Sequence, residues 1–223
     1  MTNKRVQDIE LAFCKLLQKT ELKKITVSMI CRDARISRAT FYTYFESIQA
    51  LLEELEERTL ADVLDILGGW EYFSFRSVGE GNAAPVFIDI CRYCARHREV
   101  FQALFGPNGD EKFVFRYECY IYQDFMRHIM AEGNIRFPEL LASSCAGATI
   151  GLTRTWLVNQ DMATMEELAQ LHTAIIYRII RSTDRFTQLL TQKGDTSSLL
   201  PESGGTSGWQ WHSRGAMFGN GKK

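Results

Sequence analysis

The side chains best suited to contact a polyanion lie together in one short segment. Between residues 38 and 44 the sequence places Arg38, Thr40, Tyr42, Thr43 and Tyr44. Guanidinium and hydroxyl groups are the groups that reach phosphate oxygens and base edges in nucleic acids. Phe41 and Phe45 are four residues apart, as on one buried face of a helix, so the polar side chains are expected on the exposed side.

Two short helices are predicted to position these side chains. Thr26 precedes a segment that ends at Ala34, and Ser37 precedes the polar segment; both residue types suit the N-cap of a helix. Only the three residues 35–37 separate the two helices, which is the length of the turn in a helix-turn-helix unit. In such a unit the second helix enters the DNA major groove, so the spacing predicts a DNA-binding module.

The charge distribution is compatible with this prediction. The whole chain of 223 residues carries a net charge of −1, which favours no particular partner. Residues 1–46, however, carry nine Lys and Arg against five Asp and Glu, whereas residues 47–69 carry one against six. A basic first segment suits a polyanion, although charge alone is equally compatible with an uneven solvated surface.

Helical periodicity extends over nearly the whole chain. The predicted helices cover about 4–19, 26–34, 37–45, 48–67, 85–105, 110–132, 138–159 and 164–190, and whether His97 interrupts the fifth is left open. Residues 70–84 read as a loop and 106–109 as a turn. Because no segment shows sustained alternation of period two, the chain is predicted to be all-α.

Residues 5–58 resemble the N-terminal domain of the TetR family of transcriptional regulators. That family shows a Thr at the start of its second helix, a turn of the type A-G-V-S, and T-hydrophobic-Y-x-H/Y-F at the end of its recognition helix. This sequence has Thr26, then A-R-I-S at 34–37, then T-F-Y-T-Y-F at 40–45. The length of the match makes the resemblance specific.

Two positions depart from the family pattern. Arg35 replaces the usual glycine at a helix end that is often left-handed, at a cost of about 1 kcal/mol. Ile48 replaces a lysine that contacts phosphate in many members. That contact is expected to be missing, or to be replaced by Lys24 or Arg38.

The second half of the chain resembles the ligand-binding and dimerising domain of one branch of the same family. The similarity lies in residues 98–110 with Phe113, and in 151–157 followed by 165–168. In the family, the last two helices pair with their copies in a four-helix dimer interface. Small residues at 146–148 and Gly151 would permit close approach of these helices.

The resemblance implies a helix-turn-helix domain over residues 1–62, joined by a long fourth helix to a helical ligand-binding and dimerisation domain over 63–193. Residues 194–223 are rich in Gly and Ser and are expected to form a flexible tail. The implied function is that of a ligand-responsive repressor, which binds a near-palindromic operator as a homodimer in the cytoplasm. The alternative is a family relative that acts as a coactivator through protein–protein contacts. The predicted DNA-binding residues are Lys24, Thr26, Ser37, Arg38, Thr40, Tyr42, Thr43 and Tyr44.

Eight aromatic residues between positions 101 and 125 form the densest apolar material outside the DNA-binding module and the expected interface. They suit either an apolar pocket for a small apolar or aromatic effector, or an aromatic core. The residues assigned to the pocket are Phe101, Phe105, Tyr117, Tyr120 and Phe125. The helix over 48–67 is the only element expected to run from one domain into the other, so a bound effector is predicted to displace it.

The remaining reactive side chains point to no metal, cofactor or enzyme. Cys91 and Cys94 form a C-x2-C pair without a second pair, so they are expected to be reduced core thiols rather than zinc ligands. His172 is predicted to lie in the core or an interface, whereas His97 and His128 are predicted at the surface. The acidic residues of the fourth helix are also expected in solvent, and they are Glu53, Glu54, Glu56 and Glu57. No apolar segment approaches the roughly 18 residues that would cross a membrane.

Overall fold

The computed structural model describes residues 4–70, 82–133, 135 and 137–192, without the side chains of residues 160 and 183–192. Every regular element in these ranges is a helix, which confirms the predicted all-α fold. The elements are α1 (Lys4–Leu17), η1 (Leu22–Lys24), α2 (Val27–Ala34), α3 (Arg38–Tyr44), α4 (Ile48–Gly68), α5 (Pro85–Arg96), α6 (Arg98–Leu104), α7 (Glu111–Ala131), α8 (Pro138–Val158), η3 (Gln160–Met162) and α9 (Met165–Gln192).

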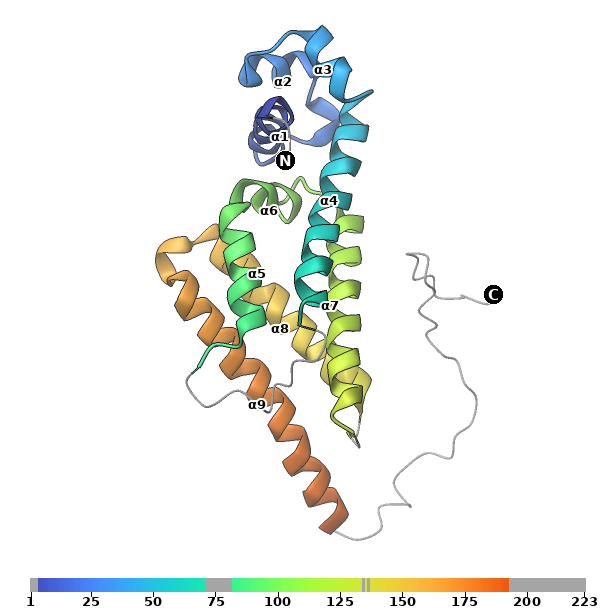
Figure 1. Ribbon diagram of the computed structural model, residues 1–223, viewed down its shortest axis with the longest axis vertical. Coiled ribbons are helices and arrows are strands. Elements are labelled where there is room, and N and C mark those ends of the chain that lie inside the picture. Colours follow the sequence, from blue (N-terminus) through green and yellow to red (C-terminus); the bar gives the residue numbers. More distant parts are fainter. Residues whose placement is uncertain (1–3, 71–81, 134, 136, 193–223) are drawn as a thin grey trace, which may run out of the picture.

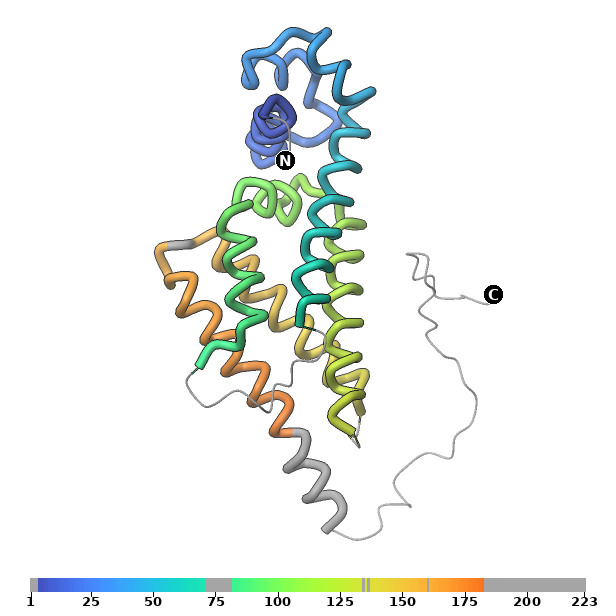
Figure 2. The backbone as a smooth tube through the Cα atoms, viewed as in Figure 1, coloured from blue at the N-terminus to red at the C-terminus, as the bar shows by residue number. Residues whose placement is uncertain are grey.

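The helices form two parts that share α4 (Figures 1 and 2). Helices α1–α3 and the first turns of α4 form one end of the molecule, called the head below. Helix α4 then runs beside α7 into the second domain, which α5–α9 complete. The predicted domain boundary at residue 62 falls inside this continuous helix. The predicted tail at 194–223 and most of the loop at 70–84 lie outside the described residues.

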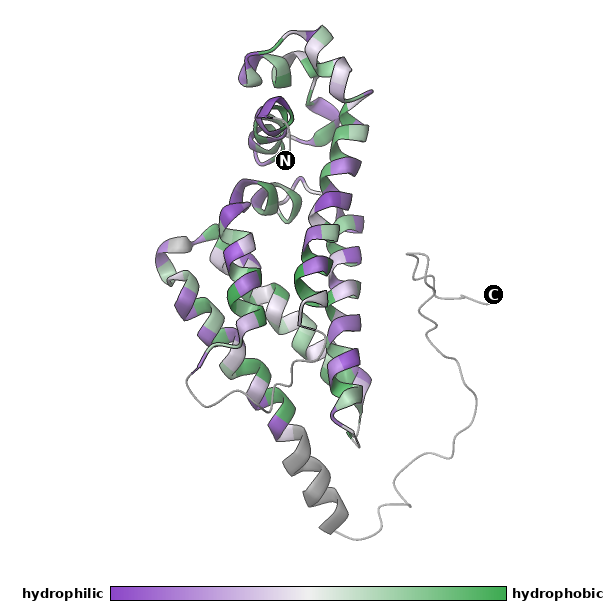
Figure 3. Ribbon diagram, viewed as in Figure 1, coloured by the Kyte–Doolittle hydropathy of each residue, from purple (hydrophilic) through white to green (hydrophobic). Residues whose placement is uncertain are grey.

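Amphipathic helices hold the head together. Hydrophobic and hydrophilic positions are interleaved along each helix (Figure 3), so each helix buries one face against its neighbours. Phe13 of α1 and Phe41 of α3 are fully buried in the core of the head, together with Leu51 of α4. Three hydroxyl side chains cap the helices that follow them: Thr26 accepts from the backbone N–H of Met29 (3.3 Å), Ser37 from that of Thr40 (3.0 Å) and Ser47 from that of Ala50 (3.0 Å).

The break near His97, left open by the sequence, is present. Helix α5 ends at Arg96, and His97 has φ −110° and ψ 31°, which separates it from α6. This break lets the short α6 turn away from α5 and lie between the head and the second domain (Figure 1). Among the described residues, no helix is both long and apolar enough to cross a membrane.

His172 lies in the core of the second domain, as predicted. Its Nε2 lies 3.2 Å from the carbonyl oxygen of Thr149, and its Nδ1 lies 3.8 Å from the Cys91 sulfur. The ring also stacks on Phe87, with centroids 5.2 Å apart. Burial lowers the pKa of His172 and raises the pKa of the Cys91 thiol to about 12, so both side chains are neutral. Cys91 and Cys94 are buried free thiols, as the sequence indicated.

Two surface predictions are wrong. His128 is only 7% exposed, because it lies on the inward face of α7 one turn after Asp124. Glu56 is only 5% exposed, because α7 packs against α4 at this point and brings Arg116 to 3.0 Å from its Oε2. The helical period alone placed Glu56 outside the apolar stripe; a second helix covers it. His97 is exposed, as predicted.

Glu56 gives the fold a testable pH dependence. Burial, then the nearby Asp110, raise the pKa of the Glu56 carboxyl from 4.5 to about 7; Arg116 opposes the shift, and Glu57 and Glu53 add to it. Because the folded chain binds this proton more tightly than the unfolded chain, the group contributes stability below about pH 4.5 that is lost as pH rises through 7. Relative to the Glu56→Gln variant, the free energy of unfolding of the native chain should fall by roughly 1–3 kcal/mol across this window.

Urea unfolding of both proteins at pH 4.5, 6 and 8 measures this difference. The exposed Glu118 of α7 provides the control, because a Glu118→Gln variant should follow the native chain at every pH. A difference between native and Glu56→Gln chains that stays constant with pH would contradict the expected titration.

Candidate nucleic-acid interface and ligand site

The turn between α2 and α3 has the helix-turn-helix geometry that the sequence predicted. Arg35 adopts the left-handed conformation, with φ 55° and ψ 47°, at the helix end where the sequence analysis expected it. The backbone N–H of Arg35 donates to the Arg32 carbonyl (3.3 Å), and the backbone N–H of Ile36 donates to the Cys31 carbonyl (2.9 Å). These bonds satisfy carbonyls at the end of α2 and turn the chain toward Ser37, so the strain of a non-glycine residue here is offset locally.

The predicted DNA-binding side chains fall into two groups. Tyr42 is 57% exposed, and Arg38 and Thr43 are exposed beside it on the outer side of α3. Tyr44, predicted on the same side, is instead half-buried and packs against the core of the head. Thr40 is also half-buried, and its hydroxyl lies 2.8 Å from the Ser37 hydroxyl.

Several of these polar groups also organise the unit itself. Thr26 and Ser37 use their oxygens as helix caps, and the Thr43 hydroxyl donates to the Ala39 carbonyl at 3.0 Å. The Arg38 guanidinium donates to the Ser28 hydroxyl and so joins α3 to α2. Ser28 is a partner that the sequence motif did not reveal.

Three basic residues of the head are paired with neighbouring carboxylates at the surface. Lys23 and Lys24 both lie 2.7 Å from Glu21, and Arg32 lies 3.0 Å from Asp33. Exposed pairs of this kind contribute little, so phosphates can replace the carboxylates without a large cost. Lys24 therefore remains available to a polyanion, whereas Ile48, at the first position of α4, is half-buried and carries no charge.

Most of the aromatic residues assigned to the ligand pocket pack on one another. Phe105 lies at the centre: its ring centroid is 5.7 Å from that of Phe101 and 5.1 Å from that of Tyr117, which meets it at 90°. Phe113 joins them at 5.7 Å, and the Arg154 guanidinium lies over the Phe105 ring at 5.8 Å. Edge-to-face and offset contacts of this kind are those of a packed aromatic core.

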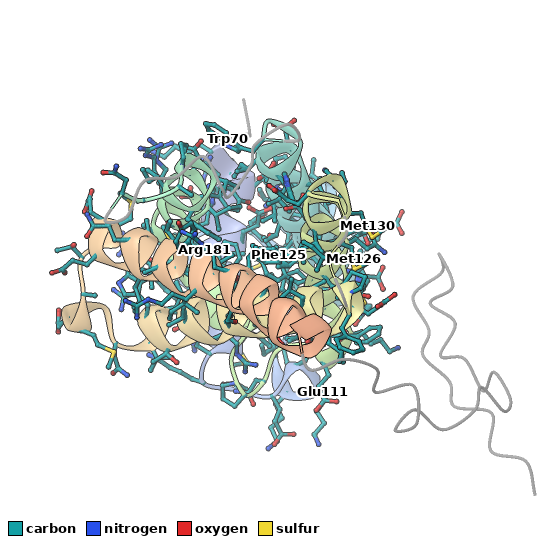
Figure 4. The ribbon with its side chains drawn as sticks, turned by 90° about the horizontal axis from the view of Figure 1, so that it is seen from below. Trp70, Glu111, Phe125, Met126, Met130 and Arg181 are labelled. Carbon is teal, nitrogen blue, oxygen red and sulfur yellow. The ribbon has the colours of Figure 1, made fainter. Side chains whose placement is uncertain are left out.

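The other two pocket residues lie further along α7. Phe125 is buried two turns beyond Tyr117, and Tyr120 is half-buried. Seen from below in Figure 4, Phe125 lies toward the middle of the second domain, whereas Met126 and Met130 lie near its edge. The structure thus separates the predicted pocket into a packed cluster near the head and a deeper region around Phe125.

Helices α8 and α9 present an apolar surface to solvent. Leu140 and Val158 of α8 are 68% and 71% exposed, and Leu171 of α9 is 46% exposed. Between the two α8 residues lie Gly147 and Gly151, where an added Cβ would meet no atom within 4 Å. This surface thus combines exposed apolar side chains with two glycines that leave room for close approach, as a helix–helix contact with another molecule requires.

Helix α4 is not the only link between the head and the second domain. The Asn108 amide donates to the Leu17 carbonyl at the end of α1 (3.0 Å), and the Gln18 amide donates to the Glu99 carbonyl of α6 (3.2 Å). Helix α1 also packs against α6. The sequence analysis missed this second link, because Asn108 lies in a turn whose position relative to α1 no local pattern specifies.

The turn that carries Asn108 needs its glycine at position 109. A Cβ there would lie 2.1 Å from the Leu104 carbonyl oxygen, which belongs to the backbone and cannot move aside cheaply. The close approach fixes the turn against the end of α6 and therefore fixes Asn108 against α1. A shift of α6 would thus be transmitted to the head.

Within the described ranges, no group of three or more His, Cys, Asp or Glu side chains could hold a metal ion.

Comparison with known families gives two matches. The family described as "Bacterial regulatory proteins, tetR family" matches residues 13–55, and that described as "Transcriptional regulator C-terminal region" matches residues 81–178. The first match contains the whole helix-turn-helix unit, and the second covers α5–α8 and the first half of α9.

The fold is similar to those of solved bacterial regulators. A TetR transcriptional regulator from Streptococcus agalactiae 2603V is 23% identical; the match covers 78% of this chain and 93% of that one, with a TM-score of 0.51. The fatty acid degradation regulator FadR from Bacillus halodurans (11% identical, 79% and 96% covered) gives 0.58, and a transcriptional regulator from Aquifex aeolicus VF5 (17% identical, 79% and 99% covered) gives 0.56. No curated protein sequence matches this chain.

Proposed function

Because the chain belongs to the TetR family of transcriptional regulators, we propose that it is a ligand-responsive repressor that binds a near-palindromic operator as a homodimer. The observation that carries the proposal is the capped helix-turn-helix unit, which presents the exposed Arg38, Tyr42 and Thr43 on its second helix. On docking, these side chains would reach base edges and phosphates, and Lys24 would contact the backbone nearby. A protein acting on an operator would work in the cytoplasm, where bacterial DNA lies.

The homodimer is proposed from the surface of α8 and α9. A two-fold pairing of these helices would bury Leu140, Val158 and Leu171, which a monomer leaves in water. Gly147 and Gly151 would allow the α8 helices to approach closely. The dimer would then place two heads on successive major grooves, about 34–36 Å apart.

The ligand response is proposed to act through both links between the head and the second domain. A ligand that prefers one arrangement of α4, α6 and α7 changes operator affinity by its differential affinity for the two arrangements, usually 1–3 kcal/mol. Ion pairs couple these elements: Arg116 of α7 to Glu56 and Glu57 of α4, and Arg58 of α4 to Glu10 of α1. A movement of α7 would therefore change the positions of α4 and α1.

One observation supports a second candidate function. Ile48 supplies no charge where many relatives contact phosphate, so a chain that retains the fold but regulates through protein contacts remains the alternative. Such a coactivator would bind another regulator and show no DNA affinity of its own.

A mobility-shift assay with the DNA upstream of the chain's own gene separates the two functions. The repressor is expected to bind this DNA, and its affinity should fall by roughly 0.9 log unit per log unit of salt for each phosphate that it neutralises. Lys24→Ala should lower the slope by about one such contact, with little change in sequence preference. The paired control is Lys112→Ala, since Lys112 is an exposed residue of α7 outside the head. Binding that is absent, or insensitive to salt between 50 and 200 mM, would favour the coactivator.

A further inference from the structure

The head meets the second domain at α1 as well as through the continuous helix α4. There, α1 packs against α6, the short helix that lies between the two parts (Figure 1). Two side-chain amides cross this contact in opposite directions: Asn108 donates to the Leu17 carbonyl (3.0 Å), and Gln18 donates to the Glu99 carbonyl (3.2 Å). This pair of hydrogen bonds is called the α1–α6 clasp below.

The Asn108 bond completes the end of a helix. Helix α1 ends at Leu17, and the last carbonyls of a helix have no donor within it. The two residues that follow α1 return their backbone N–H groups to carbonyls before Leu17, so the Leu17 carbonyl takes its donor from Asn108. The turn that carries Asn108 lies so close to α6 that a Cβ at Gly109 would be 2.1 Å from the Leu104 carbonyl oxygen. A closely packed turn of the second domain thus caps a helix of the head.

The two bonds of the clasp fix the direction in which α1 lies on α6. A hydrogen bond weakens steeply when its angle departs from a straight line, whereas the burial of apolar side chains is non-directional. Helix α4 joins the two parts as well, but a long helix bends gently along its length. Since the clasp lies to one side of α4 (Figure 1), it opposes such bending and sets the orientation of the head.

From α1 the constraint extends to the exposed helix α3. Helix α1 packs against α2, and α2 packs against α3. Phe13 of α1 and Phe41 of α3 are both fully buried in the core of the head. Arg58 of α4 lies 2.7 Å from the buried Glu10 of α1, which ties α1 to α4. The head therefore moves as one unit, so the orientation of α1 determines that of α3.

We propose that Asn108 and Gln18 fix the orientation of the head and thereby select the spacing of the two half-sites in the operator. They are positioning residues, which act through α1. One extra base pair between half-sites separates them by about 3.4 Å and rotates one against the other by roughly 35°. A head held by both α4 and the clasp follows this change only by breaking the clasp, whereas a head held by α4 alone follows it by bending. Because it needs a dimer on a near-palindromic operator, this assignment rests on the proposed function.

Palindromes that differ only in the number of base pairs between their half-sites test the assignment on the full chain. The native chain should prefer the operator's own spacing by at least about tenfold over spacings one or two base pairs longer or shorter. Asn108→Ala should reduce this preference to about threefold or less, and it should leave the affinity for DNA with a single half-site within about twofold. Gln18→Ala should act in the same direction, and it remains as a test if Asn108→Ala does not fold.

Gln102→Ala is the matched control. The Gln102 side chain of α6 makes a bond of the same kind, from its amide to the Leu157 carbonyl (2.6 Å), but this bond lies wholly within the second domain. The control should keep the native spacing preference. A preference that survives both Asn108→Ala and Gln18→Ala overturns the assignment. An equal loss of affinity for the single half-site also overturns it, because the effect would then lie inside the head.

A distance measurement without DNA separates this assignment from the proposed function. Spin labels at the exposed Lys15 of α1 and the exposed Glu118 of α7 report the orientation of the head on the second domain. The labels are attached through introduced non-cysteine residues, because the chain has cysteines of its own, and labelled chain is diluted with unlabelled chain. The distance distribution should be narrow in the native chain and in Gln102→Ala, and broader in Asn108→Ala.

The two measurements fail in different ways. A broader distribution in Asn108→Ala, in a chain that binds no palindrome, would support the orienting role of the clasp and reject the repressor. An unchanged distribution in both Asn108→Ala and Gln18→Ala would overturn the role of the clasp, even where the native chain binds its operator.

Discussion

Replacing Gly151 with leucine is expected to give a folded monomer that no longer binds a full palindrome. An added Cβ at this position meets no atom within 4 Å in the single chain, so the substitution should leave the protomer intact. In the proposed dimer the same side chain would separate the two α8 helices, whose axes otherwise approach within about 8–10 Å. Since one head binds only a half-site, operator affinity should fall by at least about 100-fold.

Sedimentation velocity and a mobility-shift titration measure the two effects on the same preparation. Gly68→Leu is the matched control, because Gly68 is also unhindered and lies at the end of α4, on neither α8 nor α9. The control should remain dimeric and bind the operator. A Gly151→Leu protein that sediments as a dimer with native affinity would show that another surface forms the interface.

The Arg38→Ala/Tyr42→Ala double variant should lose at least about 100-fold in operator affinity while its dimer and helical content remain unchanged. Tyr42 is 57% exposed, and Arg38 is exposed beside it, so their removal leaves the buried side chains of the head in place. Base and phosphate contacts of this kind are worth about 1–3 kcal/mol each. Circular dichroism and mobility shift report the two quantities.

A separate variant distinguishes contact with DNA from bracing of the head. Arg38 also donates to Ser28 of α2, so Ser28→Ala removes that bond while keeping the guanidinium. If Arg38 acts by contacting DNA, Ser28→Ala should change affinity by no more than a few-fold. An effect as large as that of the double variant would instead assign Arg38 to positioning α3.

The two links between the head and the second domain suggest how these effects combine. Helix α4 continues from one part into the other, whereas Asn108 and Gln18 join α6 and its following turn to α1. A ligand that displaces α7 would act on α4 through Arg116 and Glu56. Glu56 therefore lies on the proposed route, and its protonation near neutral pH would also change the coupling between α4 and α7.

The amino-acid sequence determined the features that depend on neighbours along the chain. Thr26 and Ser37 fixed the helix starts, the three residues 35–37 fixed the turn, and the apolar period fixed the helices. These signals are local: a cap bonds to a backbone N–H three residues on, and an amphipathic face repeats every turn. The left-handed conformation expected at Arg35 is present for the same reason.

Only the tertiary structure decided which polar side chains are enclosed. The sequence pattern predicted Glu56 and His128 at the surface, but the packing of α7 against its neighbours encloses both. Helix α7 is apolar on so many sides that its period does not identify which face is buried. The Asn108–Leu17 bond joins residues 91 positions apart. Burial and pairing of this kind depend on which helices pack together, and that choice is made by the whole core rather than by any single segment.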